Sequence, residues 1–317
     1  MKLNRKSIFR KTLWALLFAF VVLNVMAFFH AIKFTRFAPE TTAMKPLKAW
    51  TTGDKVTALF LGVGSPKPAN DALPSQPFET VEIKGEKRLE AWHIRTENAV
   101  GTVVLFHGHK GKKSSMLDKS DEFLKMGFNT LLVDFRGSGG SEGYETTIGY
   151  REAEDVLACF DYLKNQGEKN IVLFGTSMGA AAVMRAMATT EIQPVALILE
   201  CPFGSMYEAT CGAFRKMKMP ATFPLAGLLV FWGGVQNGFW AFSHEPDEYA
   251  KSISCPTLLL WGEKDIRVLR SEMDAVFENL QGDKQLIIYP EAGHENYLVK
   301  YREEWVAQVK GFLKKHV

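Results

Sequence analysis

Short apolar runs recur along the chain from residue 101 onward, and stretches with helical periodicity separate them. The apolar runs cover residues 101–106, 129–133, 170–174, 195–199, 257–261 and 285–289. The helical patterns cover residues 114–126, 149–165, 178–188, 270–280 and 299–315. A short strand without a polar face is buried on both sides, as in a parallel sheet covered by helices. The pattern predicts an α/β fold, preceded by two alternating strands at 80–83 and 88–95.

The segment 203–254 interrupts this alternation. It separates two predicted strands by 52 residues, whereas connections in compact α/β units usually have about 2–6 residues. Its composition is aromatic and rich in Met, with the apolar stretch 223–232 at its centre. A segment of this length is too short to bury a core of its own. We therefore expect a lid over a site.

The N-terminus contains the longest apolar stretch. Residues 12–32 carry no formal charge, and their core, 13–29, is interrupted only by Asn24. A bilayer span needs about 20 mostly apolar residues, whereas the apolar region of a signal peptide has about 7–15. The length predicts a signal anchor over residues 1–36. A cleavable signal, with small residues around Val25-Met26-Ala27, and a buried core helix are the alternatives.

Charge divides the chain into two unlike parts. The whole carries +3, but residues 1–36 hold seven basic and no acidic side chains, which leaves a balance of −4 for the rest. A slightly acidic body argues against a nucleic-acid partner, because phosphate binding needs a basic face. Five basic residues precede the span and four follow it between 33 and 48. The positive-inside rule then predicts a cytoplasmic N-terminus and a body outside the cytoplasm.

The remaining composition is that of a chain that buries a core, with 47% apolar and 23% charged residues. Residues 37–78, rich in Pro, Thr, Gly and Lys, read as a connector with one short helix around 55–61. The predicted α/β domain is then 79–317. Its four cysteines have neither CxxC nor metal-ligand spacing, which favours buried free thiols, with a Cys201–Cys211 disulfide as the alternative in an exported body.

A G-x-S-x-G motif, Gly175-Thr176-Ser177-Met178-Gly179, lies between a predicted strand and a predicted helix. This is the context of a nucleophile elbow, a sharp turn that presents a strained serine at a helix N-terminus. The small flanking residues allow the turn, and the helix dipole favours negative charge there. The context favours Ser177 as a nucleophile over an ordinary strand-to-helix turn.

A serine nucleophile needs a base and a group that orients the base. His294 follows the last predicted strand, and Asp265 follows the penultimate one, 29 residues earlier. The order Ser177, Asp265, His294 is one of the three known serine-triad orders, that of the hydrolases with this elbow. Glu263 and Glu200 are competitors for the acidic position. Both predicted partners have an alternative interpretation as solvated loop residues.

The loop 107–111 follows the first buried strand and is the expected second side of an oxyanion hole. Its donor would be the backbone N–H of His109, and the other donor that of Met178, the residue after the nucleophile. The segment 106–114 also resembles a P-loop, but Phe106 and Lys113 occupy required Gly and Ser/Thr positions, so its lysines are expected to be solvated. His107 and His109 lack a further ligand at metal-site spacing.

Taken together, these motifs resemble the serine α/β-hydrolases, in the branch of serine aminopeptidase-like and monoacylglycerol lipase-like proteins. The resemblance extends over about residues 80–317 and includes the 107–108 loop, the stretch 134–141, the Ser177 elbow, Asp265 and His294. It implies an eight-stranded, mostly parallel sheet and no cofactor. The sequence departs from the usual pattern of this family at Trp261, before Gly262, where relatives often carry His.

The expected protein is a membrane-anchored serine hydrolase that cleaves a carboxylic ester through an acyl-enzyme. The apolar lid favours a small-molecule acyl or aromatic ester as substrate. A peptidase or amidase would use the same three residues and stays open as an alternative. A non-catalytic binding protein is a further one, although such proteins usually lose a member of the triad.

Overall fold

A computed structural model describes residues 5–219 and 224–317 and contains one large sheet. In this part of the chain the sheet has eight strands in the order β10-β9-β8-β7-β5-β6-β4-β3. The strands are β3 (Phe78–Lys84), β4 (Arg88–Ile94), β5 (Thr102–Phe106), β6 (Asn129–Val133), β7 (Ile171–Thr176), β8 (Ala196–Glu200), β9 (Thr257–Gly262) and β10 (Lys284–Tyr289). Among the pairings described within this sheet, those of β4 with β3 and with β6 are antiparallel and the others are parallel. The predicted α/β fold with a mostly parallel sheet is confirmed.

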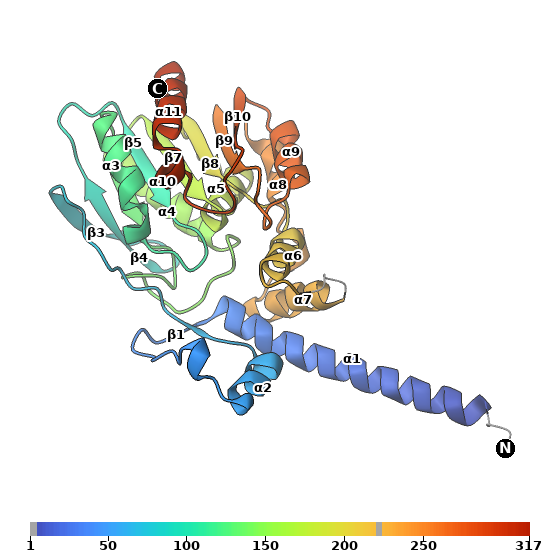
Figure 1. Cartoon of the computed structure of the whole chain (residues 1–317). Helices are drawn as coiled ribbons and strands as arrows, with labels where there is room; N and C mark the ends of the chain where they lie inside the picture. The colour runs from blue at the N-terminus through green and yellow to red at the C-terminus, as the bar shows by residue number, and fades with distance from the viewer. Residues whose placement is uncertain (1–4, 220–223) are drawn as a thin grey trace.

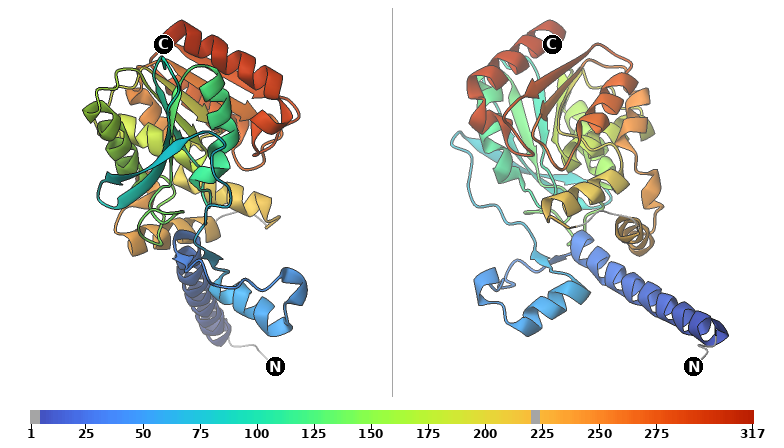
Figure 2. Two further views of the ribbon diagram at one scale, coloured as in Figure 1. Left: turned by 90° about the vertical axis from the view of Figure 1, so that its left-hand side faces the viewer. Right: turned by 45° about the vertical axis from the view of Figure 1, so that its right-hand side comes forward.

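Helices cover both faces of the sheet. They are α3 (Leu117–Lys125), α4 (Glu152–Asn165), α5 (Met178–Thr189), α9 (Arg270–Asn279), α10 (Tyr297–Lys300) and α11 (Arg302–His316). Helices α3 and α11 share one face, and α4 and α5 lie on the other (Figure 2). Aromatic rings join the layers, because Phe123 of α3 contacts both Phe174 of β7 and Trp305 of α11. Strands β5 to β9 are buried almost throughout, which explains their apolar composition.

Helix α1 (Arg5–Thr35) projects from the body and ends against it (Figure 1). Residues Lys6–Thr35 are long and apolar enough to cross a membrane, with a mean hydropathy of 2.3 in their most apolar window, of which only 11% is buried. A core helix would be mostly buried, so that interpretation is wrong. The buried residues of α1 lie near its C-terminal end and are Ala27, Ala31 and Thr35.

The connector packs on the body instead of hanging free. It contains the paired strands β1 (Phe37–Ala38) and β2 (Ser65–Pro66), a short 3₁₀ helix (Leu47–Ala49) and helix α2 (Thr52–Leu61). A capping box formed by Thr51 and Asp54 stabilises the N-terminus of α2. His30 of α1 is hydrogen-bonded to the Leu59 carbonyl of α2 at 2.9 Å. Lys67 then donates to the Ser141 carbonyl at 2.6 Å, which ties the connector to a loop of the body.

The expected lid segment forms several short helices. These are α6 (Met206–Lys216), α7 (Leu225–Asn237), α8 (Pro246–Tyr249) and two 3₁₀ turns (Ala241–Ser243, Ala250–Ser252). Only its first part stands apart from the sheet layers, because α8 packs between α5 and α9. Phe223, at the start of the predicted apolar centre, lies outside the described residues. The separate helices are therefore α6 and α7, a shorter unit than residues 203–254.

A buried ionic cluster lies below the loop that follows β5. The expectation that the lysines of this loop are solvated is wrong for Lys113, whose side chain is fully buried. Its ammonium group pairs with Asp134 and, at 2.6 Å, with Glu90. The ring of Trp92 lies 4.6 Å from the same nitrogen. Lys113, which departs from the P-loop pattern, thus ties strand β4 and the end of β6 to this loop.

Candidate active site

Ser177 lies at the turn between β7 and α5 with φ 54° and ψ −112°, a conformation that non-glycine residues rarely adopt. The flanking glycines are required by close contacts. A Cβ on Gly175 would lie 2.6 Å from the Ala180 nitrogen, and one on Gly179 would lie 2.4 Å from the Phe106 carbonyl oxygen. The Ser177 amide donates to the Glu200 carbonyl at 2.8 Å. The turn is therefore held in place by backbone contacts that do not use the serine hydroxyl.

The structure brings Ser177, His294 and Asp265 together. The Nε2 atom of His294 lies 3.1 Å from Ser177 Oγ, and its Nδ1 atom lies 2.7 Å from Asp265 Oδ2. The three side chains come from loops after β7, β9 and β10, whose carboxyl ends share one edge of the sheet. Asp265 is buried, and its Oδ1 accepts the backbone N–H groups of Arg267 at 2.7 Å and Val268 at 3.0 Å. The carboxylate is thus oriented before any substrate arrives.

Electrostatics makes His294 a stronger base than a free histidine. Burial lowers the pKa of the imidazole, but the neighbouring Cys201 sulfur and the hydrogen bond to Asp265 raise it more, and the pKa lies above its usual 6.5. A carboxylate within hydrogen-bond distance stabilises the imidazolium in this way. The arrangement can accept a proton from Ser177 and stabilise the resulting charge.

The competing carboxylates are used elsewhere or exposed. Glu200 is buried, accepts the Trp305 indole N–H at 2.9 Å and the Thr176 hydroxyl at 3.0 Å, and does not reach His294. Glu263 is exposed to solvent. The only acidic side chain that touches the imidazole within the described ranges is therefore Asp265.

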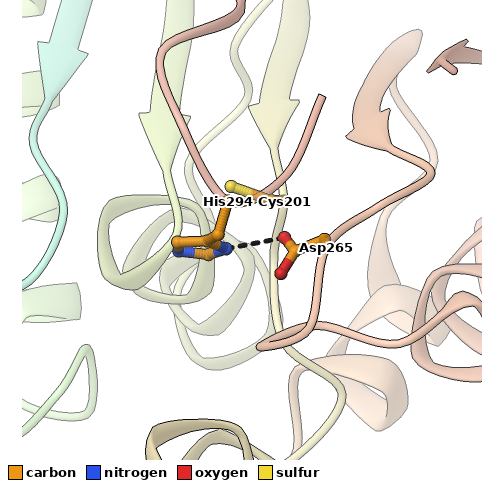
Figure 3. Close-up of side chains that lie close together, drawn as sticks. All are labelled: Cys201, Asp265 and His294. Carbon is orange, nitrogen blue, oxygen red and sulfur yellow. Dashed lines mark hydrogen bonds and ion pairs between the residues drawn. The ribbon is translucent and has the colours of Figure 1, made fainter. Parts of the chain in front are cut away.

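Cys201 is a member of the site that the sequence reasoning missed. It follows β8 with φ 40° and is buried beside the imidazole, as Figure 3 shows. Its sulfur, a nitrogen of His294 and an oxygen of Asp265 lie within 4.8 Å of one another. The available signal was its position at the end of a strand next to the elbow strand. Cys201 and Cys211 are both free thiols, so the disulfide alternative is wrong.

Cys201, Asp265 and His294 are also residue types that bind metals such as Zn²⁺, and they are the group of such side chains found close together in the described residues. However, the Nδ1 atom of His294 already engages Asp265, and its Nε2 atom faces Ser177. Both nitrogens therefore take part in a hydrogen-bond chain that fits proton transfer better than metal binding. His107 and His109 belong to no such group among these residues.

The loop 107–111 lies against the elbow, because a Cβ on Gly108 would lie 3.6 Å from Ser177 Cβ. The His109 ring stacks on Phe34 of α1 at 5.5 Å with an interplanar angle of 18°. Burial lowers the pKa of His109 to about 3, so this imidazole is neutral at pH 7. His107 instead accepts the Phe135 backbone N–H at 3.2 Å. The assignment of the backbone N–H groups of His109 and Met178 to an oxyanion hole stays a prediction.

Ser177 and His294 open into a cavity of about 400 Å³. Apolar residues of α6 and α7 form much of its wall, including Met206, Leu229 and Val230. The last turns of α1 also reach it through Ala31 and Phe34. The apolar N-terminal helix is thus part of the cavity wall, which no local pattern in the sequence indicated.

Comparisons with known proteins agree with the fold. The family model described as serine aminopeptidase, S33, matches residues 97–232. Uncharacterized protein YqkD of Bacillus subtilis (strain 168) is 26% identical over 228 residues, 71% of this chain and 75% of that protein. Lysophosphatidylserine lipase ABHD12 of Macaca fascicularis is 28% identical over 194 residues, 56% of this chain and 44% of that protein. The solved esterase Pf2001 of Pyrococcus furiosus has a TM-score of 0.66 and 27% identity, covering 80% of this chain and 99% of that chain.

A mostly parallel eight-stranded sheet with a strained serine between strand and helix defines the class of α/β-hydrolases. The chain has the α/β-hydrolase fold, and the proteins it is similar to include an esterase and a lipase. The resemblance noted from the motifs is confirmed at this level.

Proposed function

We propose that the protein is a serine hydrolase that cleaves carboxylic esters with an apolar acyl part. The observation that supports this most strongly is the hydrogen-bond chain from Ser177 through His294 to Asp265 at the floor of an apolar cavity. Such a chain is the machinery of nucleophilic acyl transfer.

In the proposed reaction, Ser177 Oγ attacks the ester carbonyl while His294 Nε2 accepts the hydroxyl proton. The backbone N–H groups of His109 and Met178 stabilise the oxyanion. Collapse of the tetrahedral intermediate breaks the bond to the alkoxy oxygen, which takes the proton from His294 and leaves as the alcohol. Water, deprotonated by His294, then attacks the acyl-serine. The bond to Ser177 Oγ breaks, Oγ takes the proton back from His294, and the carboxylic acid leaves. Asp265 stays ionised and stabilises the imidazolium in both steps.

The lining of the cavity favours an ester over a peptide substrate. An enzyme that removes residues from a peptide N-terminus has to bind an ammonium group, which needs a negative partner. Within the described residues, no aspartate or glutamate lines the cavity. The family model described as a serine aminopeptidase nevertheless keeps peptidase activity as the second candidate. A panel of acyl esters and aminoacyl amides would separate the two activities.

Replacement of Ser177 by Ala tests the nucleophile. We expect kcat for a p-nitrophenyl ester to fall by about 10⁴–10⁶-fold, because the covalent route is lost. Labelling by a fluorophosphonate should disappear as well. Ser252→Ala, at an exposed serine remote from the cavity, is the matched control and should retain both. Unchanged turnover in Ser177→Ala would exclude the proposed mechanism.

We also propose that α1 anchors the protein in a bilayer with the body outside the cytoplasm. Helix α7 has no charged residue and packs against the apolar stretch of α1. A second uncharged helix beside α1 supports the proposed membrane anchor. Trp232 donates to Asn24 at 3.2 Å and Gln236 donates to the Phe28 carbonyl at 2.8 Å. Helix α7 would then lie at the membrane surface.

Protease treatment of right-side-out membrane vesicles tests the sidedness. We expect digestion of the body and protection of α1, whereas protection of the whole chain would contradict the outward orientation. Release of an intact body that lacks α1 during alkaline washing would instead show that the N-terminal segment is a cleaved signal.

A further inference from the structure

Three positively charged side chains line the same cavity as Ser177. Lys110 follows His109 in the loop after β5, Lys216 ends α6, and Arg267 follows Asp265 by two residues. They come from three segments that are distant in the chain and converge only in the folded molecule. Their convergence beside a nucleophile calls for a chemical explanation, because like charges repel.

These charges lack acidic partners. In the parts of the chain that the structure describes, no carboxylate lies within ion-pair distance of any of the three. Lys110 donates to a neutral group, the Ser65 hydroxyl, at 2.8 Å. Lys110 and Lys216 are exposed at the cavity, and Arg267 is half-buried. Partial burial, and then the charges of Lys216 and Arg267, lower the pKa of Lys110, so Lys110 lies within range of repulsion by each of the other two cations. An anion bound among them would relieve this repulsion.

We infer that the three cations form a subsite for a negatively charged group of the ester substrate. The inference rests on the proposed function and adds the class of substrate, a single-chain acyl ester with an anionic headgroup such as a phosphate. The apolar residues of α7 and the end of α1 take the chain. The cations take the headgroup on the alcohol side of the ester.

The position of the subsite limits the distance between anion and ester. The Arg267 amide donates to Asp265 Oδ1 at 2.7 Å, and Lys110 is adjacent to the predicted oxyanion donor. Two of the three cations therefore belong to the short loops that build the reacting centre. We therefore place the anionic group on the side of the cleaved carbonyl, as in a glycerophosphate headgroup, and not at the far end of the acyl chain.

The experiment compares lysophosphatidic acid with the monoacylglycerol of the same chain, using the full protein in neutral detergent micelles. The two esters differ only in the phosphate, so the ratio of their kcat/KM values measures the subsite. We expect the wild type to prefer the anionic ester by about tenfold or more, through KM. In Lys216→Gln the ratio should fall by about fivefold to tenfold, and further in the Lys110→Gln, Lys216→Gln double variant.

Lys218→Gln is the matched control, since Lys218 is exposed two residues beyond Lys216 and does not line the cavity. Its ratio should equal that of the wild type. A ratio near one in the wild type, or an equal ratio in Lys216→Gln and Lys218→Gln, would overturn the inference. The proposed function would stand in either case as long as the monoacylglycerol is cleaved and Ser177→Ala is inactive.

Two further arms separate a headgroup subsite from other sources of the effect. Inorganic phosphate should compete with the anionic ester in the wild type and more weakly in Lys216→Gln, and equal inhibition of both would contradict the subsite. A non-hydrolysable anionic detergent should not raise turnover of the monoacylglycerol. If it reproduces the whole preference, the cations attract a charged surface and the inference fails.

Discussion

The floor and the roof of the cavity are built in different ways. The floor consists of Ser177, Asp265 and His294 on short loops, each held by backbone contacts or by a partner at hydrogen-bond distance. The roof consists of α6, α7 and the end of α1, which meet mainly through apolar side chains. Directional contacts hold reacting atoms to a fraction of an ångström, whereas apolar packing depends on volume. Changes to the floor should therefore alter rate, and changes to the roof should alter substrate choice.

After Ser177→Ala, the largest predicted effect also belongs to the floor. Asp265→Asn should lower kcat by about 10⁴-fold, because the amide favours the wrong tautomer of His294 and cannot stabilise the imidazolium. The acidic limb of the wild-type kcat/KM profile should lie above the ordinary histidine pKa of about 6.5. Loss of the carboxylate lowers the pKa of His294, so the acidic limb should move to lower pH in the variant.

Stopped assays of kcat/KM against pH on a short ester measure both effects. Glu263→Gln, at the exposed carboxylate two residues earlier, is the control and should retain the wild-type rate and profile. An unshifted acidic limb in Asp265→Asn would mean that another group raises the pKa of His294.

The next effect concerns the support below the floor. Lys113→Met should destabilise the fold by about 3–5 kcal/mol, because it leaves the buried Asp134 carboxylate without its cation. Thermal unfolding of the full chain in detergent, compared with Lys125→Met, measures it. Lys125 pairs with Glu122 at 2.9 Å but is exposed, so its loss should cost about 0–1 kcal/mol. Equal melting temperatures for the two variants would show that the buried cluster does not support the floor.

The smallest effect belongs to the roof and should change selectivity more than rate. Ala31→Leu places a larger side chain in the cavity wall. The ratio of kcat/KM for long-chain to short-chain esters should fall by about tenfold to hundredfold. Ala27→Leu, one turn earlier on the same buried side of α1 but outside the cavity lining, is the matched control. An unchanged ratio in Ala31→Leu would contradict a role of α1 in substrate choice.

The two regions also differ in how far the sequence predicted them. The apolar run 129–133 coincides with β6, and the elbow motif placed Ser177 between β7 and α5, because both follow from neighbouring residues. The sequence also put forward the pair of Asp265 and His294, through their order along the chain. The burial of Lys113 was not predicted, because the local sequence of a Gly-rich loop does not show whether its lysine is hydrated or pairs with a carboxylate far away in the chain.

The roof was predicted least well. The segment 203–254 was expected to act as one lid, but α8 packs on α5 and α9, and the end of α1 takes part in the wall instead. Neither fact is visible in periodicity, which reports which face of an element is apolar and not what covers that face.

The sequence by itself determined the α/β fold, the apolar N-terminal helix and the three candidate side chains of the floor. These depend on short-range features: apolar periodicity, the glycines of a sharp turn, and residues at strand ends that one edge of a parallel sheet brings together. Only the tertiary structure decided that Cys201 contacts His294, that α1 borders the cavity, and that Lys110, Lys216 and Arg267 converge there. Such contacts join segments far apart in the chain, and their geometry depends on the packing of the whole core.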